Sequence, residues 1–280
     1  MRKFLALALS CILLVATLAS CAVGLGDPDA INNYTPEVKT ITTDKGVFTF
    51  EEAEGDTAIL VGYNGRATKD DHVEIPTEFN GRPVVGIGNN VFYNLAAVVE
   101  VKIPATVTSI GDYAFANCTE LTSVTLPDGL LSIGFATFTG CTKLETVNLG
   151  NSLVSIGDSA FKSCPVLKNI ALPATLESIG EYAFAYDEAL TEFAAPAALK
   201  DLGTLAFYNC TGLTSIKLSD TLENIGEYAF VTEKTTMKAI IDTTSYSEGS
   251  KAAEYVAAMA DTVIEETEAP EDNGVTDPEA

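Results

Sequence analysis

One histidine and six cysteines are the side chains of this chain best suited to nucleophilic, acid–base or metal-binding chemistry. A Cys–His pair or a Ser–His–Asp triad would have to use His72, because it is the only histidine. His72 stands in the polar run Lys69-Asp-Asp-His72, which is typical of a solvated loop. The sequence contains no His/Cys zinc pattern, no calcium loop and no glycine-rich phosphate loop. We therefore expect no enzyme activity, no metal and no cofactor.

Four of the cysteines recur at multiples of 23 residues: Cys118, Cys141, Cys164 and Cys210. If each copy is one rung of stacked strands about 4.8 Å apart, Cys210 lies two rungs, about 10 Å, from Cys164 and cannot form a disulfide with it. An adjacent pair could be oxidised. We interpret the set instead as a column of buried thiols that pack as small apolar groups. Asp187 occupies the same position in one copy.

The cysteines belong to a pattern that repeats every 23 residues without insertion. In each copy an Ile-Gly or Leu-Gly pair is followed by phenylalanine, five residues after the Ile or Leu. A fixed period of this length is the signature of a solenoid, in which each unit packs only against its neighbours. The phenylalanines are predicted to stack as an interior spine. They are Phe92, Phe115, Phe138, Phe161, Phe184, Phe207 and Phe230.

Each copy also contains an alternating segment. Val124 and Leu126 alternate with Ser123 and Thr125, as in a strand with one buried face. Stacking these strands predicts a parallel sheet along one side. The glycine of the Ile-Gly pair is predicted to take a positive φ in a tight reversal. The acidic residue that often follows it is predicted to favour the start of one helical turn.

Segments such as Val107-Thr-Ser-Ile-Gly-Asp-Tyr-Ala-Phe-Ala-Asn-Cys-Thr-Glu-Leu-Thr-Ser-Val-Thr-Leu-Pro resemble the BspA-like leucine-rich repeats of bacterial surface proteins. The resemblance covers residues 84–230 and implies a leucine-rich-repeat solenoid, with one parallel-sheet strand and one short helical turn per 23-residue repeat. Residues 45–83 are similar to the strand-rich cap that opens such domains, and residues 231–264 to the short helix and strand that close them. Caps are expected because the end repeats would otherwise expose apolar edges.

The amino-terminal segment predicts export and lipid attachment. Residues 1–20 combine Arg2 and Lys3 with an apolar run too short to span a membrane comfortably. The run ends in Leu-Ala-Ser-Cys21, which resembles the bacterial lipobox, where a diacylglyceryl group is attached to the cysteine. Lipidated Cys21 would anchor the chain in the membrane through several acyl chains. The alternative is ordinary signal cleavage, with Cys21 incidental.

The flanks and the charge restrict the partners further. Residues 21–44 are predicted to be a flexible tether, and the acid-rich residues 265–280 a disordered tail. Removing residues 1–20 leaves 14 basic and 39 acidic residues, so the formal charge changes from −23 to −25. Such a surface repels the phosphates of nucleic acids and anionic lipid headgroups. We therefore expect no nucleic-acid partner, and a lipid anchor as the membrane attachment.

Two functions remain from these observations. The family resemblance implies an adhesin-like envelope protein, exposed at the cell surface, that binds a protein or glycoprotein; related proteins are linked to host-matrix and intercellular adhesion. The alternative is a scaffolding envelope lipoprotein with no external ligand. No small-molecule substrate is expected. The candidate partner-binding face is the outward side of the predicted sheet, with Glu100, Lys102, Ser123, Thr125, Thr146, Asn148, Asn169, Glu192, Ser215 and Lys217.

That face is nearly free of aromatic side chains, which usually dominate binding energy. Aromatic residues gather on the predicted turns instead, where they either cover the back of the solenoid or contact a partner. These residues are Tyr93, Tyr113, Phe135, Tyr182, Tyr186, Tyr208 and Tyr228.

Overall fold

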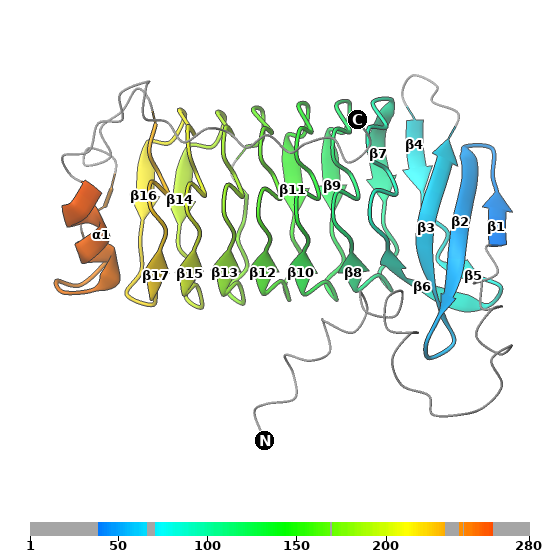
Figure 1. Ribbon diagram of the computed structural model, residues 1–280, viewed down its shortest axis with the longest axis horizontal. Helices are drawn as coiled ribbons and strands as arrows, with labels where there is room; N and C mark the ends of the chain where they lie inside the picture. The colour runs from blue at the N-terminus through cyan, green and yellow to red at the C-terminus, as the bar shows by residue number, and fades with distance from the viewer. Residues whose placement is uncertain (1–38, 66–70, 169, 233–240, 243, 260–280) are drawn as a thin grey trace, which may run out of the picture. The chain divides into compact units, whose positions relative to one another are not determined.

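The computed structural model describes residues 39–65, 71–168, 170–232, 241–242 and 244–259, all within one compact unit, residues 38–280. Figure 1 shows this unit as successive coils, with strands β1 to β3 at one end and helix α1 at the other. The predicted signal peptide, Cys21, most of the predicted tether and the predicted tail lie outside the described residues.

The first strands form an antiparallel sheet that joins the coils directly. β1 (Lys39–Thr42) pairs with β2 (Gly46–Ala53), and β2 pairs with β3 (Thr57–Gly65). β3 then runs parallel to β6 (Arg82–Ile87), which also pairs with the short β5 (Glu78–Phe79). Alternate side chains of β2 face inward, so that Phe48 and Phe50 are fully buried. This apolar layer meets the first coil, where Tyr63 packs against Phe92.

The alternating segments form the predicted parallel ladder, which we call the first ladder. From residue 98 onward its partners are 23 residues apart, as in Val124↔Val147 and Phe193↔Ile216. The ladder is interrupted, because the described residues 170–172 form no strand. Its strands are β4 (Asp71–Glu74), β7 (Val98–Lys102), β9 (Ser123–Thr125) and β11 (Thr146–Asn148), then β14 (Glu192–Ala194) and β16 (Ser215–Lys217).

A second parallel ladder was not predicted from the sequence. It is built from the two residues that precede each repeat glycine, such as Ser132 and Ile133. The buried isoleucine alternates with a polar residue, but a two-residue strand is too short for its alternation to be recognised. Its strands are β8 (Ser109–Ile110), which pairs with β6, and the continuous set β10 (Ser132–Ile133), β12 (Ser155–Ile156), β13 (Ser178–Ile179), β15 (Asp201–Leu202) and β17 (Asn224–Ile225).

The interior phenylalanine spine is confirmed. Consecutive rings from Phe92 to Phe230 lie 5.0–5.3 Å apart between centroids, with interplanar angles of 2–11°. All seven side chains are at most 2 % exposed. Parallel rings at this spacing stack with an offset, which suits their quadrupoles better than face-to-face overlap.

The segment between each glycine and phenylalanine differs from the predicted helical turn. This segment and the residues just after the phenylalanine form a series of turns, in which positions on either side of the phenylalanine take a positive φ, as at Tyr113 (54°) and Asn117 (57°) around Phe115. Alternate N–H groups donate to the next copy, for example Phe115 N to the carbonyl of Thr137 at 2.9 Å. Neighbouring coils thus supply the partners that an isolated helical turn would need to find within itself.

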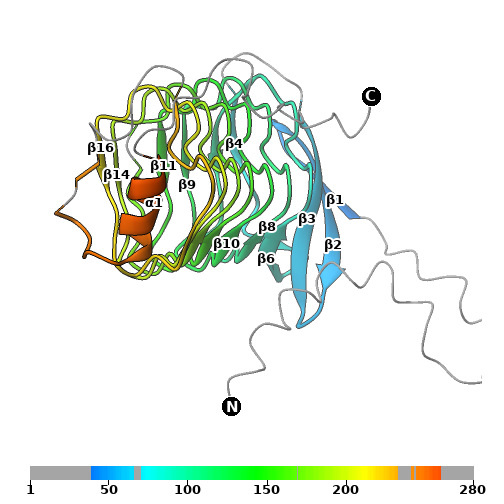
Figure 2. The same cartoon turned by 60° about the vertical axis from the view of Figure 1, so that its left-hand side comes forward.

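The other end of the solenoid is closed by α1 (Lys251–Met259), which lies beside the last coil in Figure 2. Ala252 is fully buried, and Tyr255 packs edge-on against Phe230 with 6.4 Å between centroids. The segment before the helix is fastened by Asp220, whose carboxylate accepts hydrogen bonds from the backbone and the hydroxyl of Ser247. The end of the phenylalanine spine is therefore covered.

Candidate binding surfaces

The predicted binding face is the outward side of the first ladder. β7 carries Glu100 and Lys102, and the paired strands bring Glu100 beside Ser123 and Thr125 beside Asn148. Asn169 lies outside the described residues. Because of the break at residues 170–172, the described part falls into two blocks. One block holds Glu100, Lys102, Ser123, Thr125, Thr146 and Asn148, and the other Glu192, Ser215 and Lys217.

The charges in the first block are paired across the ladder. His72 Nδ1 lies 2.8 Å from Glu100 Oε2, and Lys102 pairs with Glu74. The loop position predicted for His72 is wrong, because register with β7 places it in strand β4. Its side chain is 64 % exposed, so the pair is solvated and worth at most about 1 kcal/mol. Beside these pairs lies a shallow depression of about 220 Å³, lined by β7 and β9.

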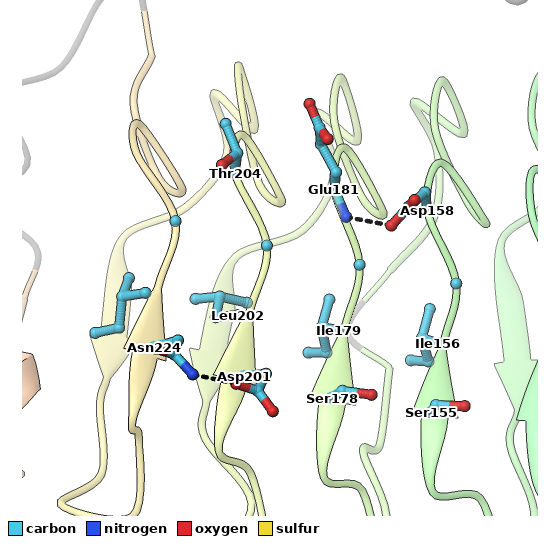
Figure 3. Close-up of a pocket in the computed structure, with 15 residues that line it drawn as sticks. Ser155, Ile156, Asp158, Ser178, Ile179, Glu181, Asp201, Leu202, Thr204 and Asn224 are labelled. Carbon is cyan, nitrogen blue, oxygen red and sulfur yellow. Dashed lines mark hydrogen bonds between the residues drawn. The ribbon is translucent and has the colours of Figure 1, made fainter. Parts of the chain in front are cut away.

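A longer groove crosses the second ladder (Figure 3), with a volume of about 580 Å³. One wall carries Ser155, Ser178, Asp201 and Asn224; Asn224 Nδ2 donates to Asp201 Oδ1 at 2.6 Å. The other wall carries Asp158, Glu181 and Thr204. Between the walls lie the backbone of the repeat glycines and the largely buried apolar residues that precede them. These are Gly157, Gly180, Gly203 and Gly226, with Ile156, Ile179, Leu202 and Ile225.

The positive φ that we predicted for the repeat glycines is wrong. None of the glycines at this position has a positive φ. Their role is close approach: a Cβ at Gly180 would lie 2.7 Å from the backbone carbon of Gly157, and one at Gly203 would lie 2.4 Å from that of Gly180. Glycine is required because the coils pack backbone to backbone at this edge.

The acidic residues after the glycines also act between coils. Asp112 Oδ1 accepts from the backbone N–H of Phe135, and Asp158 Oδ1 from that of Glu181, each at 2.8 Å. Each carboxylate therefore caps an N–H of the following copy rather than its own turn. Their regular structural use weighs against a catalytic pair of carboxylates.

The interpretation of the cysteines as buried thiols is confirmed. Cys118, Cys141, Cys164 and Cys210 are free and fully buried. Each Sγ contacts the carbonyl of a phenylalanine one copy earlier, at 3.0–3.3 Å. Burial raises the pKa of Cys118 to about 12 and the pKa values of the other three well above the usual thiol range. A thiol held in its protonated form is a poor nucleophile.

Asp187 is the exception in this column. Its side chain is fully buried, and its Oδ1 accepts a 2.7 Å hydrogen bond from the backbone N–H of Cys164. Its Oδ2 has no hydrogen-bond partner among the described residues. Burial raises the pKa of this carboxyl well above its usual range, against the smaller effect of the hydrogen bond from Cys164. Unlike the thiols, each of which contacts a carbonyl of an earlier copy, the carboxyl of Asp187 leaves its Oδ2 without a partner among the described residues.

The aromatic residues of the turns pack largely on one another. Tyr113 meets Phe135 edge-on at 5.2 Å between centroids, and Tyr186 meets Tyr208 at 5.5 Å. Lys162, only 7 % exposed, places its ammonium 5.2 Å from the ring of Tyr182. These contacts favour the covering role for most of the set. Phe135 stands apart, because 38 % of its side chain remains exposed.

Two further properties concern only the described part of the chain. It contains no group of three or more His, Cys, Asp or Glu residues arranged to hold a metal ion. No helix in it has the length and apolar character of a membrane span.

Comparison with known proteins places these features in a family context. The sequence profile described as "BspA type Leucine rich repeat region" matches residues 85–210 and 177–266, with six copies. No curated protein sequence matches the chain.

Several solved structures are similar, among them two leucine-rich-repeat proteins of bacteria. A leucine-rich cell surface protein from Faecalibacterium prausnitzii A2-165 is 29 % identical, with a TM-score of 0.50; the match covers 64 % of this chain and 54 % of that protein. The T. pallidum leucine-rich-repeat protein TpLRR is also 29 % identical, with a TM-score of 0.45, over 61 % of this chain and 68 % of that one.

Proposed function

The chain belongs to the BspA-type leucine-rich-repeat family, and from that premise we propose that it is a lipid-anchored envelope protein, displayed at the cell surface, that binds a protein or glycoprotein partner in the manner of an adhesin. Leucine-rich repeats are protein-binding scaffolds, and one similar structure is of a cell surface protein. The observation that carries the proposal is the solenoid itself, whose interior is filled by phenylalanines while two faces present polar side chains. The binding of a protein or glycoprotein partner and the role in adhesion are both part of this proposal.

A non-catalytic role fits the chemistry of the chain. The four cysteines of the repeats are buried, and their raised pKa values keep the thiols protonated. His72 is paired with Glu100 at the solvent-exposed surface of strand β4. Regular repeats give little opportunity for the local departures from regularity that active sites usually show. Asp187, which departs from the cysteine column, is enclosed in the core.

Surface display is tested by treating intact cells with a protease. Loss of the solenoid from live cells supports display, whereas complete protection in intact cells with digestion after lysis would favour an internal scaffolding role. A second exported lipoprotein of known internal location serves as the control for cell integrity.

The anchor is tested at Cys21. Mass spectrometry of the amino-terminal peptide should show an acylated cysteine, and Cys21→Ser should release the protein from the membrane fraction. Several acyl chains give stable anchoring, so the release should be nearly complete. A Cys21→Ser variant that stays in the membrane would leave ordinary cleavage as the better explanation of the signal.

The partner-binding strip on the first ladder is tested by obstruction. Thr125 and Thr146 are exposed neighbours near its middle, so Thr125→Arg and Thr146→Arg should weaken binding of the immobilised full-length chain to matrix glycoproteins. The matched control is Glu248→Arg, an exposed position outside both ladders. Equal binding by all three variants would exclude this strip.

A further inference from the structure

We propose that the outward face of the second ladder, from β10 to β17, binds an extended polypeptide segment with apolar side chains at one end and lysines or arginines at the other. This face is separate from the strip on the first ladder, and the inference does not depend on surface display or adhesion.

The first observation is where exposed apolar side chains gather. Among the described residues, the exposed large apolar side chains are Leu131 (46 %), Phe135 (38 %), Val166 (38 %) and Val154 (36 %). Leu131 and Val154 stand in successive coils, joined by a 2.8 Å hydrogen bond from Val154 N to the carbonyl of Leu131. Phe135 lies two residues after the end of β10 and packs edge-on against Tyr113. Three of the four thus lie at β10 and β12, and such clustering is typical of an interaction site.

The second observation is the charge of the coils that follow. Beyond Val154, the positions equivalent to Leu131, Ser132 and Phe135 hold six acidic residues and, apart from one lysine, neutral polar ones. That lysine, Lys200, is tied to Glu177 at 3.1 Å. All of these carboxylates are exposed. They are Asp158, Glu177, Glu181, Asp201, Glu223 and Glu227. An occupant of this end must be basic, because like charges at close range are strongly unfavourable.

The third observation is the shape of the face. The groove of about 580 Å³ runs across β12, β13, β15 and β17, and its floor includes the backbone of the repeat glycines (Figure 3). Because a glycine carries no side chain, another backbone can approach the face closely at these positions. From β10 to β17 there are four steps of about 4.8 Å, or about 19 Å, which an extended segment of about six residues spans.

The chain's own flanks are unsuitable occupants. Residues 265–280 contain seven acidic residues and no basic one, and residues 21–38 contain three acidic residues and no basic one. A second copy, with the same formal charge of −23, would also be repelled. The partner is therefore a basic segment of another protein.

The test uses the full-length chain and a fluorescent octapeptide with two leucines and a valine in its first half and three lysines in its second, together with the same peptide in reversed order. Anisotropy should report binding of one orientation, and affinity should fall about ten-fold when the lysines are replaced by glutamates or the apolar residues by serines. Added salt should weaken it as well.

Variants then locate the site. Glu181→Lys should weaken binding about ten-fold by adding repulsion, and Ser178→Tyr should do so by filling the groove. Leu131→Ser should lower affinity for the peptide with leucines but not for its serine version. The matched control is Glu248→Lys, the same change of charge at an exposed position outside both ladders, and folding of each variant is checked by its thermal unfolding.

Absence of binding to either orientation would overturn the proposal. So would an equal loss in Glu181→Lys and Glu248→Lys, because that result indicates attraction to the acidic chain as a whole. Binding that does not change in Ser178→Tyr would show that the groove is not the site.

Discussion

Two columns of side chains run through the interior of the solenoid, and they differ in what they tolerate. The spine has phenylalanine in every copy from Phe92 to Phe230, whereas the thiol column contains Leu95 at one end and Asp187 between cysteines. Each inner ring of the spine stacks on a ring at both sides, so a smaller side chain would lose two contacts. Each thiol makes its polar contact with only one carbonyl of an earlier copy, and Leu95 and Asp187 show that the position accepts side chains of other kinds. A position in the interior therefore accepts fewer residue types when its side chain contacts a larger number of neighbouring coils.

The largest expected effect is in the spine. Phe138→Ala removes a fully buried ring between two stacked neighbours and should lower the free energy of unfolding by about 3–5 kcal/mol. Cys141→Ala, in the same coil, should cost only about 1 kcal/mol. Denaturant unfolding of both variants measures the difference, and similar losses would contradict the distinction between the columns.

The repeat glycines should behave like the spine, because they too contact the neighbouring coil. Gly180→Ala should cost about 1–3 kcal/mol, since its Cβ would lie 2.4 Å from Asp158 Oδ1 and 2.7 Å from the Gly157 backbone. Gly129→Ala is the control, because its nearest neighbour is a methyl carbon of Thr108 at 3.5 Å. Thermal unfolding should separate the two, and a harmless Gly180→Ala would mean that the coils can spread apart.

Asp187 tests the tolerance of the thiol column directly. Its folded-state pKa is raised by burial, so the folded chain keeps a proton that the unfolded chain loses above about pH 4. The contribution of this group to the free energy of unfolding is therefore fully present below about pH 4. It is lost as the pH rises from there toward the raised folded-state pKa. Asp187→Cys should remove that part of the pH dependence and raise stability at neutral pH by about 1–3 kcal/mol.

Unfolding measured from pH 4 to pH 8 for both proteins decides this prediction. Asp187→Asn is a second variant, because an amide keeps the shape of the side chain without titrating. If the wild type and both variants share one pH profile between these limits, the buried acid is not the cause.

The smallest effect should come from ion pairs between coils on the surface. Lys143 contacts Glu120 at 2.7 Å, but the two side chains are 57 % and 44 % exposed. Solvent screening limits such a pair to about 0.2–1 kcal/mol. A double-mutant cycle with Lys143→Ala and Glu120→Ala measures the coupling energy of the pair. A coupling energy as large as the loss of stability in Phe138→Ala would contradict the prediction that interior contacts stabilise the solenoid more than surface ion pairs do.

Much of the fold follows from the repeat alone. The spacing of the phenylalanines predicts the spine, and the alternation at Val124 and Leu126 predicts the first ladder. The second ladder was missed because strands of two residues carry no recognisable alternation. The groove was missed with it, since Asp158 and Asp201 belong to different positions of the repeat and share a face only after the coil closes.

By itself, the sequence determined the period, the residues that share a column and the identity of the buried rings, because in a solenoid a fixed period places equivalent residues one rung apart. The tertiary structure decided how residues of different columns lie relative to one another. It placed His72 on a strand beside Glu100, gave the repeat glycines their role of close approach, and enclosed Asp187 in the core. The physical reason is that distances between columns depend on how each coil turns back on itself, and that path is set by hydrogen bonds and contacts with neighbouring coils.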